Sequence, residues 1–85
     1  MQKLWSDLAW EQFQDWQIRD RKTLRRLCQL IQSIDRNGYK CIGKPEPLKG
    51  VLSGWWSVRI DEVNRLIFKI DNGIIVINSC MGHYD

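Results

Sequence analysis

Two prolines, Pro45 and Pro47, separate two kinds of hydrophobic pattern in this sequence, and this division restricts the fold more than any other feature. Before the prolines, apolar residues recur every three or four positions, as on one side of an amphipathic helix. After Gly54, apolar and polar residues alternate, which is typical of half-buried strands. Because proline lacks a backbone N–H and disfavours helix in the residue before it, residues 44–49 are predicted to be extended. The pattern therefore predicts helices first and a sheet second.

The first half is predicted to form a short strand followed by a helical hairpin. The strand covers residues 3–6, and a helix capped at residue 6 or 7 runs to about residue 19. A second helix, capped by Asp20, ends at Asn37-Gly38. The stripes predicted to face the core are Ala9, Phe13 and Trp16 in the first helix and Leu24, Leu27, Cys28, Ile31 and Ile34 in the second.

The second half is predicted to form an antiparallel meander. Residues 56, 58 and 60 share one face of its first strand, and a turn at residues 61–64 leads to a second strand over 65–70. Asp71-Asn72-Gly73 predicts a tight turn into a third strand, 74–77, buried on both faces. The predicted fold class is α+β, an N-terminal strand and a two-helix hairpin packed on a twisted antiparallel β-sheet.

Length and composition favour a single folded domain over residues 1–85. A hydrophobic content of 44% with five tryptophans predicts an ordered core rather than a disordered chain. The three cysteines are widely spaced and include no Cys-x-x-Cys pair, which predicts reduced packing residues in a cytoplasmic protein. No apolar run approaches the roughly 20 residues that span a bilayer, so we expect no membrane partner.

Positive charge is concentrated between Arg19 and Lys49, although the formal net charge is only +3. Such a surplus can follow the backbone of a polyanion and gain salt-sensitive affinity. A solvated helix face explains the same pattern equally well. The residues predicted to bind RNA on the outer surface of the second helix are Arg21, Lys22, Arg25 and Arg26.

The chain also contains groups for metal-free RNA cleavage, which needs a base, an acid and cations around the phosphate. Glu46, between two prolines, is a candidate base, and the only histidine, His83, can exchange a proton near neutral pH. Arg59 and Arg65 can bind phosphate oxygens, and Tyr84 can stack on a base. Each side chain also has an ordinary explanation, as a loop carboxylate, a solvated or ion-paired arginine, or a solvated chain end.

Taken together, these residues stand in segments that resemble the YoeB-type toxins of bacterial toxin–antitoxin modules, a branch of the RelE superfamily. The resemblance runs through nearly the whole chain. Its segments are Leu4-Trp5-Ser6, Gly43-Lys44-Pro45-Glu46-Pro47-Leu48-Lys49, Leu52-Ser53-Gly54-Trp55-Trp56-Ser57, Asn64-Arg65-Leu66 and Gly82-His83-Tyr84.

The resemblance implies a RelE-like fold and a ribosome-dependent mRNA endoribonuclease, or mRNA interferase, that enters the A site and inhibits translation. Cleavage would leave a 2′,3′-cyclic phosphate and a 5′-hydroxyl, with no cofactor or metal. The residues matched to the family's roles are Glu46 as general base, His83 as general acid, Arg65 at the phosphate, Tyr84 in orienting the substrate, and Lys49 and Arg59 in support.

The resemblance further implies three partners, namely a cognate antitoxin of the YefM/Phd type, the ribosome with its rRNA and mRNA, and a second copy of the chain. Two other functions remain open from the sequence. Relatives of the same fold act without catalysis by binding a protein such as DNA gyrase, and a passive RNA-binding module would use the basic helix and the tryptophans. The combination of Glu46, Arg65, His83 and Tyr84 favours the nuclease.

Overall fold

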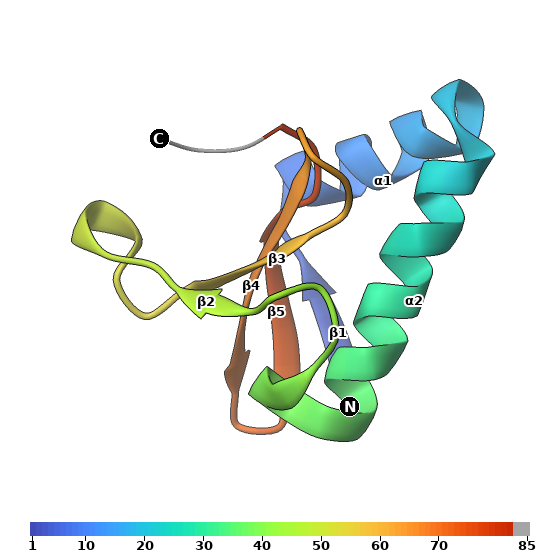
Figure 1. The fold of residues 1–85 in the computed structure, drawn as a ribbon. Coiled ribbons are helices and arrows are strands. Elements are labelled where there is room, and N and C mark those ends of the chain that lie inside the picture. Colours follow the sequence, from blue (N-terminus) through green and yellow to red (C-terminus); the bar gives the residue numbers. More distant parts are fainter. Residues whose placement is uncertain (83–85) are drawn as a thin grey trace.

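Two helices cover one face of a single five-stranded sheet, whose strand order is β1-β5-β4-β3-β2 (Figure 1). The computed structural model describes residues 1–82. Short 3-10 turns cover Gly38–Lys40 and Gly50–Leu52. The helices are α1 (Asp7–Arg19) and α2 (Arg21–Asn37), and the strands are β1 (Gln2–Trp5), β2 (Glu46–Pro47), β3 (Trp56–Arg59), β4 (Arg65–Asp71) and β5 (Ile74–Ser79).

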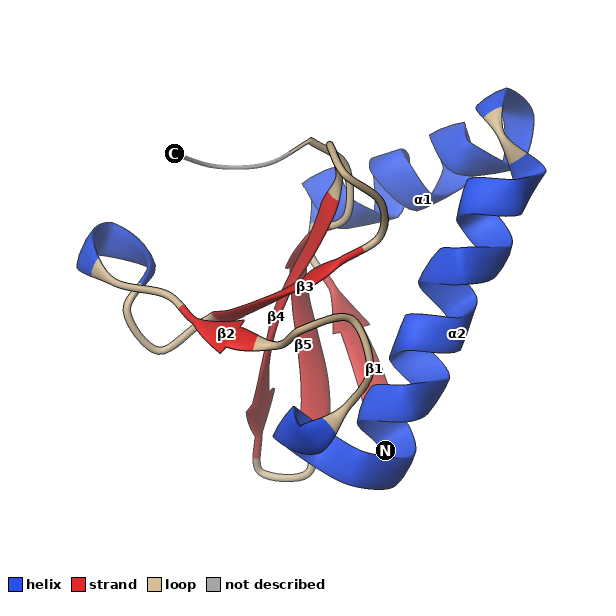
Figure 2. Ribbon diagram, in the orientation of Figure 1, coloured by secondary structure: helices blue, strands red, loops and turns tan. Residues whose placement is uncertain are grey.

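Both helices begin at the predicted caps. The Ser6 hydroxyl accepts a hydrogen bond from the backbone N–H of Ala9 at 3.0 Å. The Asp20 carboxylate accepts from the N–H groups of Lys22 and Thr23, which satisfies two donors of the first turn of α2. α2 ends at Asn37 and is followed by the capping residue Gly38, whose φ of 60° favours glycine. The predicted strand–helix–helix order is confirmed, and Figure 2 shows both helices on the same side of the strands.

The predicted α+β fold class is confirmed, and the antiparallel meander forms part of a mixed sheet that β1 joins at one edge. β4 pairs antiparallel with β3 and with β5, as the meander predicts. β1, however, pairs parallel with β5, with Leu4 opposite Val76. A parallel pair needs a long connection, which the helical hairpin and the rest of the sheet supply. Alternation along a strand predicts which residues are buried but not the direction of its neighbour.

The hydrophobic core lies between the helices and the sheet. Its fully buried members include Ala9 from α1, Leu27, Leu30 and Ile34 from α2, and Val58, Leu66, Phe68, Ile75 and Ile77 from the sheet. Leu24 and Cys28 are half-buried, at the margin of the predicted stripe. The expectation that β5 is buried on both faces is wrong, because Ile74 and Val76 point to the face that no helix covers and are half-buried.

The proline-rich segment is extended only in part. Glu46 and Pro47 form β2 and pair antiparallel with β3, at the edge of the sheet. Lys44, in contrast, has a φ of 55°, so the predicted extended conformation does not reach that residue. The preceding residue, Gly43, is held against β3, because its carbonyl accepts a hydrogen bond from the N–H of Arg59 at 2.8 Å. Within residues 1–82, no helix has the length and apolar character needed to cross a membrane.

Candidate functional site

Glu46, Arg59 and Arg65 lie on the face of the sheet that points away from the helices. The register pairs Glu46 with Ser57, and Arg59 with Arg65. Residues paired across two strands lie on the same face of a sheet, and so do alternate residues of one strand. Ser57 and Arg59 are alternate residues of β3, so Glu46, Arg59 and Arg65 lie on the same face. The neighbouring residues Trp56 and Val58 pack on the helical side. Three of the predicted site residues are thus brought to one face by backbone pairing alone.

The Glu46 carboxylate is exposed at this face. Its backbone is restrained on both sides, by the two flanking prolines and by the pairing of β2 with β3. The N–H of Leu48 continues the pairing by donating to the carbonyl of Trp55 at 2.9 Å. Glu46 forms no ion pair with any of residues 1–82, so no described cation occupies its carboxylate oxygens. These oxygens can therefore accept a proton from a bound molecule.

Arg65 begins β4 and is half-buried, with its guanidinium oriented by the turn before it. Its Nη1 donates to the carbonyl oxygens of Asp61 and Asn64, at 2.7 and 3.1 Å. The Asp61 carboxylate in turn accepts from the N–H groups of Val63 and Asn64. Burial acts to raise the pKa of Asp61, but hydrogen bonds from the Asn64 side chain and from these two backbone groups outweigh it and lower the pKa below 3.8.

The chain after β5 returns to the same site. Arg65 donates its backbone N–H to the carbonyl of Gly82 at 2.8 Å, and Gly82 donates its own N–H to Oδ1 of Asn64 at 2.7 Å. Gly82 is the last described residue, so the predicted acid and orienting residues, His83 and Tyr84, lie outside the described residues.

On its other side, this segment is held by α1. The backbone N–H of Cys80 donates to Oε1 of Gln12 at 2.7 Å, and Nε1 of Trp16 donates to the Cys80 carbonyl at 2.8 Å. The Cys80 thiol contacts the Ala9 carbonyl at 3.5 Å, and burial raises its pKa to about 12. We call Cys80-Met81-Gly82 the tail root, because it is fixed between α1 and the turn before β4.

Two further polar features of this face escaped the sequence analysis. Nζ of Lys69 lies 4.6 Å from the ring centroid of Trp55, within the range of a cation–π contact. Residues 65, 67 and 69 lie on the same face of β4, because side chains two positions apart in a strand point the same way. Strand periodicity could therefore have placed Lys69 on the face that carries Arg65. Asn64 stands within one of the family segments, but its hydrogen bond to Gly82 is a tertiary contact that no local sequence pattern predicts. Lys49 is exposed just after β2, beside the short turn Gly50–Leu52.

The basic residues of α2 form a separate surface on the helical side of the molecule. Arg21, Lys22 and Arg25 are exposed, whereas Arg26 is half-buried. A hollow of about 530 Å³ lies beside them, lined by Lys22, Thr23, Arg25, Arg26, Gln29, Ile60 and Asp61. The structure therefore does not bring these cations together with Glu46, although the Asp61 turn borders both the hollow and Arg65.

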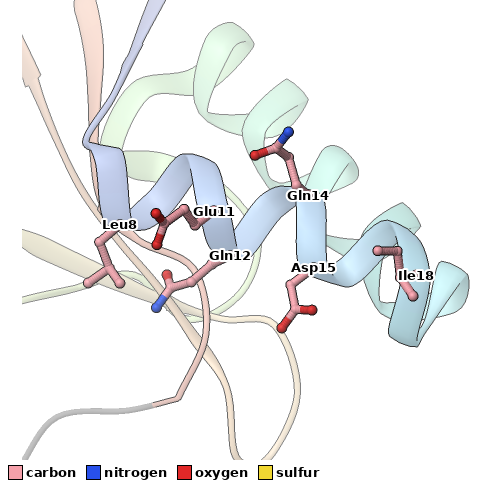
Figure 3. Close-up of a pocket in the computed structure, with 6 residues that line it drawn as sticks. All are labelled: Leu8, Glu11, Gln12, Gln14, Asp15 and Ile18. Atoms are coloured by element: carbon pink, nitrogen blue, oxygen red, sulfur yellow. The ribbon is translucent and has the colours of Figure 1, made fainter.

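A second hollow, of about 470 Å³, runs along α1 and shares Gln12 with the contacts that hold the tail root. Figure 3 shows Leu8, Gln12 and Asp15 pointing to one side of the helix and Gln14 to the other. Its acidic members are Glu11 and Asp15, and Asp15 is paired with Arg19 at 3.3 Å. Within residues 1–82, no three His, Cys, Asp or Glu side chains gather as a metal-ligand set.

By fold, the mixed sheet with two helices on one face matches the toxins of type II toxin–antitoxin modules. The family model that describes the "YoeB-like toxin of bacterial type II toxin-antitoxin system" matches residues 5–84. The chain belongs to this YoeB family of type II toxin–antitoxin toxins.

Individual relatives agree with this assignment. The chain is 46% identical over 76 residues to Toxin RelK of Mycobacterium tuberculosis, which covers 89% of each protein. Among solved structures, the toxin in a YoeB–YefM complex from Staphylococcus aureus matches with a TM-score of 0.92 and 39% identity, over 99% of this chain and 98% of that one. A YoeB dimer from the same organism matches with a TM-score of 0.92 and 40% identity, over the same shares.

Proposed function

We propose that this toxin is a metal-independent endoribonuclease that cuts mRNA in the ribosomal A site and thereby stops translation. The observation that carries the proposal is the convergence on one open face of an exposed carboxylate, Glu46, two arginines, Arg59 and Arg65, and the segment that leads into His83. Membership of the YoeB toxin family supports the same activity.

In the proposed reaction, Glu46 accepts the proton of a ribose 2′-hydroxyl, and the resulting oxygen attacks the adjacent phosphorus. The bond from phosphorus to the 5′-oxygen breaks, and His83 donates a proton to that leaving oxygen. The products are a 2′,3′-cyclic phosphate and a 5′-hydroxyl, so atoms and protons balance without a cofactor. The pairing of β2 with β3 supports the role of Glu46, because a restrained base loses little freedom when the substrate binds.

Arg65 is the proposed stabiliser of the negative charge that develops on the phosphate oxygens. Its orientation by two carbonyl oxygens supports this role, because a guanidinium already fixed in place needs no rearrangement during the reaction. Arg59 and Lys49 are proposed to attract the neighbouring phosphates, and Tyr84 to orient the substrate.

The basic side of α2 is proposed to contact ribosomal RNA while the opposite face of the sheet reaches the message. Lys22, Arg25 and Arg26 line the hollow that the Asp61 turn borders, and Arg21 is exposed on the same helix, which supports a cationic RNA contact on α2 that is separate from Arg65. Ribosome binding of this kind places the proposed activity in the cytoplasm. The affinity for the ribosome would fall as the salt concentration rises, because each phosphate that a cation neutralises releases counterions.

We also propose two protein partners, a cognate antitoxin of the YefM/Phd type and a second copy of the toxin. A YefM antitoxin is bound to the related toxin in the Staphylococcus aureus complex, and a dimer of that toxin has been solved. An acidic, disordered antitoxin segment that folds on contact would complement the cationic site face.

The test is cleavage of an end-labelled mRNA in a reconstituted translation reaction, with and without ribosomes. Replacing either proton-transfer residue, as in Glu46→Gln or His83→Ala, is expected to lower the cleavage rate about 10²–10⁴-fold. Glu11→Gln is the matched control, because Glu11 is an exposed glutamate of α1 away from the site. Normal translation without any cut would overturn the nuclease proposal and direct the search to a non-catalytic protein target, starting with a DNA gyrase supercoiling assay.

A further inference from the structure

The side chain of Asn64 joins the turn before β4 to the tail root. Its Nδ2 donates to both oxygens of the Asp61 carboxylate, at 3.1 and 3.0 Å. Its Oδ1 accepts the backbone N–H of Gly82 at 2.7 Å. Both ends of one amide are therefore used, each by a different part of the chain.

The chemistry of the neighbours determines the orientation of this amide. An ionised carboxylate only accepts hydrogen bonds, so the NH₂ end of Asn64 must face Asp61. This leaves the oxygen end for Gly82, whose N–H can only donate. Because hydrogen bonds keep the pKa of Asp61 low, the carboxylate is ionised at neutral pH.

Gly82 is held through both of its backbone polar groups by two consecutive residues. Asn64 accepts from the Gly82 N–H, and Arg65 donates its own N–H to the Gly82 carbonyl. Gly82 itself adopts a φ of 74°, in the left-handed region that favours glycine. At the other end of the tail root, α1 holds Cys80 through Gln12 and Trp16.

We propose that Asn64 is a positioning residue for RNA cleavage, which holds the Gly82 backbone next to Arg65, at the point from which the chain leads into His83. This inference rests on the proposed function. Asn64 need not touch RNA, because its effect is the placement of the residue that donates the proton. A misplacement of about 1 Å far from the reacting atoms can lower a rate about 10²-fold.

The first measurement is single-turnover mRNA cleavage at increasing ribosome concentration. Asn64→Ala is expected to lower the maximal rate at least tenfold, while the ribosome concentration that gives the half-maximal rate changes less than twofold. Asn37→Ala, at an exposed asparagine that ends α2, is the matched control and should keep the wild-type rate. An equal loss in both variants, or none in Asn64→Ala, would contradict the positioning role.

A paired exchange tests whether the hydrogen bonds, rather than folding in general, carry the effect. Asp61→Asn together with Asn64→Asp reverses the polarity of the pair, so that an oxygen can still accept from the Gly82 N–H and an amide can still donate between the two side chains. This double variant should recover at least half of the rate lost in Asn64→Ala. Failure to recover, with circular dichroism unchanged, would overturn the inference.

The exchange rate of the Gly82 amide proton, followed by NMR, gives a readout that needs no ribosome. It should rise at least tenfold in Asn64→Ala and return towards the wild-type value in the paired exchange. An unchanged exchange rate would refute the inference without affecting the proposed function. A wild-type protein that never cuts mRNA would overturn the proposed function, and the role of Asn64 in cleavage with it.

Discussion

Replacing Gly43 by alanine should lower the free energy of unfolding by about 2–5 kcal/mol, from two separable causes. The first is the backbone, because Gly43 has a φ of 92°, where a side chain costs about 1–2 kcal/mol. The second is space, because an added Cβ would lie 2.8 Å from Cδ2 of Leu30 and 3.2 Å from Cβ of Val58. Leu30 and Val58 are fully buried, so relief requires a shift of the core, which costs about 1–3 kcal/mol.

Gly54 provides a matched control for this prediction. Its φ is 94°, close to that of Gly43, but an added Cβ would meet nothing within 4 Å. Gly54→Ala should therefore show the backbone cost alone, and both variants share the loss of chain freedom in the unfolded state. The difference between the two variants isolates the packing cost.

Urea unfolding followed by far-ultraviolet circular dichroism measures both variants. We expect Gly43→Ala to be less stable than Gly54→Ala by about 1–3 kcal/mol. Two values within about 0.5 kcal/mol of each other, the usual scatter between independent sites, would refute the close approach of Gly43 to the core. A shift of residue 43 in this variant should also disturb Glu46. The Gly43 carbonyl accepts a hydrogen bond from the N–H of Arg59 in β3, and β3 is the strand that pairs with β2.

Three further predictions concern the tail root and the turn before β4. Trp16→Phe should lower the unfolding free energy by about 1–3 kcal/mol in urea, because the buried Cys80 carbonyl loses its donor. With a thiol reagent at pH 8, Cys80 should react at most about a thousandth as fast as an unfolded cysteine, because a pKa near 12 instead of 9.0 depletes the thiolate. Because the pKa of Asp61 is lowered in the folded protein, its contribution to stability is complete above about pH 4 and is lost as the pH falls through the folded value. Unfolding measured between pH 4 and pH 2 should thus show a smaller loss of stability in Asp61→Asn than in the wild type.

Matched variants decide each of these outcomes. Trp10→Phe changes a half-exposed tryptophan and should be milder than Trp16→Phe, so an equal loss would argue against the bond to Cys80. Mass spectrometry should detect label on the half-buried Cys28 before Cys80, and the reverse order would contradict the burial of Cys80. Glu62→Gln, in the same turn, is the control for Asp61→Asn. If it reduced the loss of stability between pH 4 and pH 2 by the same amount, the loss could not be attributed to Asp61.

Local signals in the sequence were enough to predict the helices and most of the strands. Ser6 and Asp20 cap helices through oxygens that act within three residues, so they could be recognised without knowledge of the fold. The alternation after Gly54 predicted the buried side of β3 and β4 for the same reason. The parallel pairing of β1 with β5 and the partial exposure of β5 depend on distant segments, and the sequence analysis missed both.

The sequence proposed the residues of the candidate site but not their arrangement. The family resemblance selected Glu46 and Arg65, while their common face follows from the register of β2, β3 and β4, which a shift of one residue would have reversed. The role of Asn64 arises from one long-range hydrogen bond to Gly82, for which no spacing rule exists.

The pairing of β1 with β5 has a consequence for the order in which the protein can fold during its synthesis. Among the described strands, β1 is made first and β5 last, so the seam between them cannot close completely until residue 77 has been added. Contacts so distant along the chain form slowly, because a long loop must close first. Cys80 and Gly82 follow still later, and they anchor the segment that leads into His83. A ribosome that is making this toxin therefore carries an unfinished sheet, and the site is assembled only after β5 has been released.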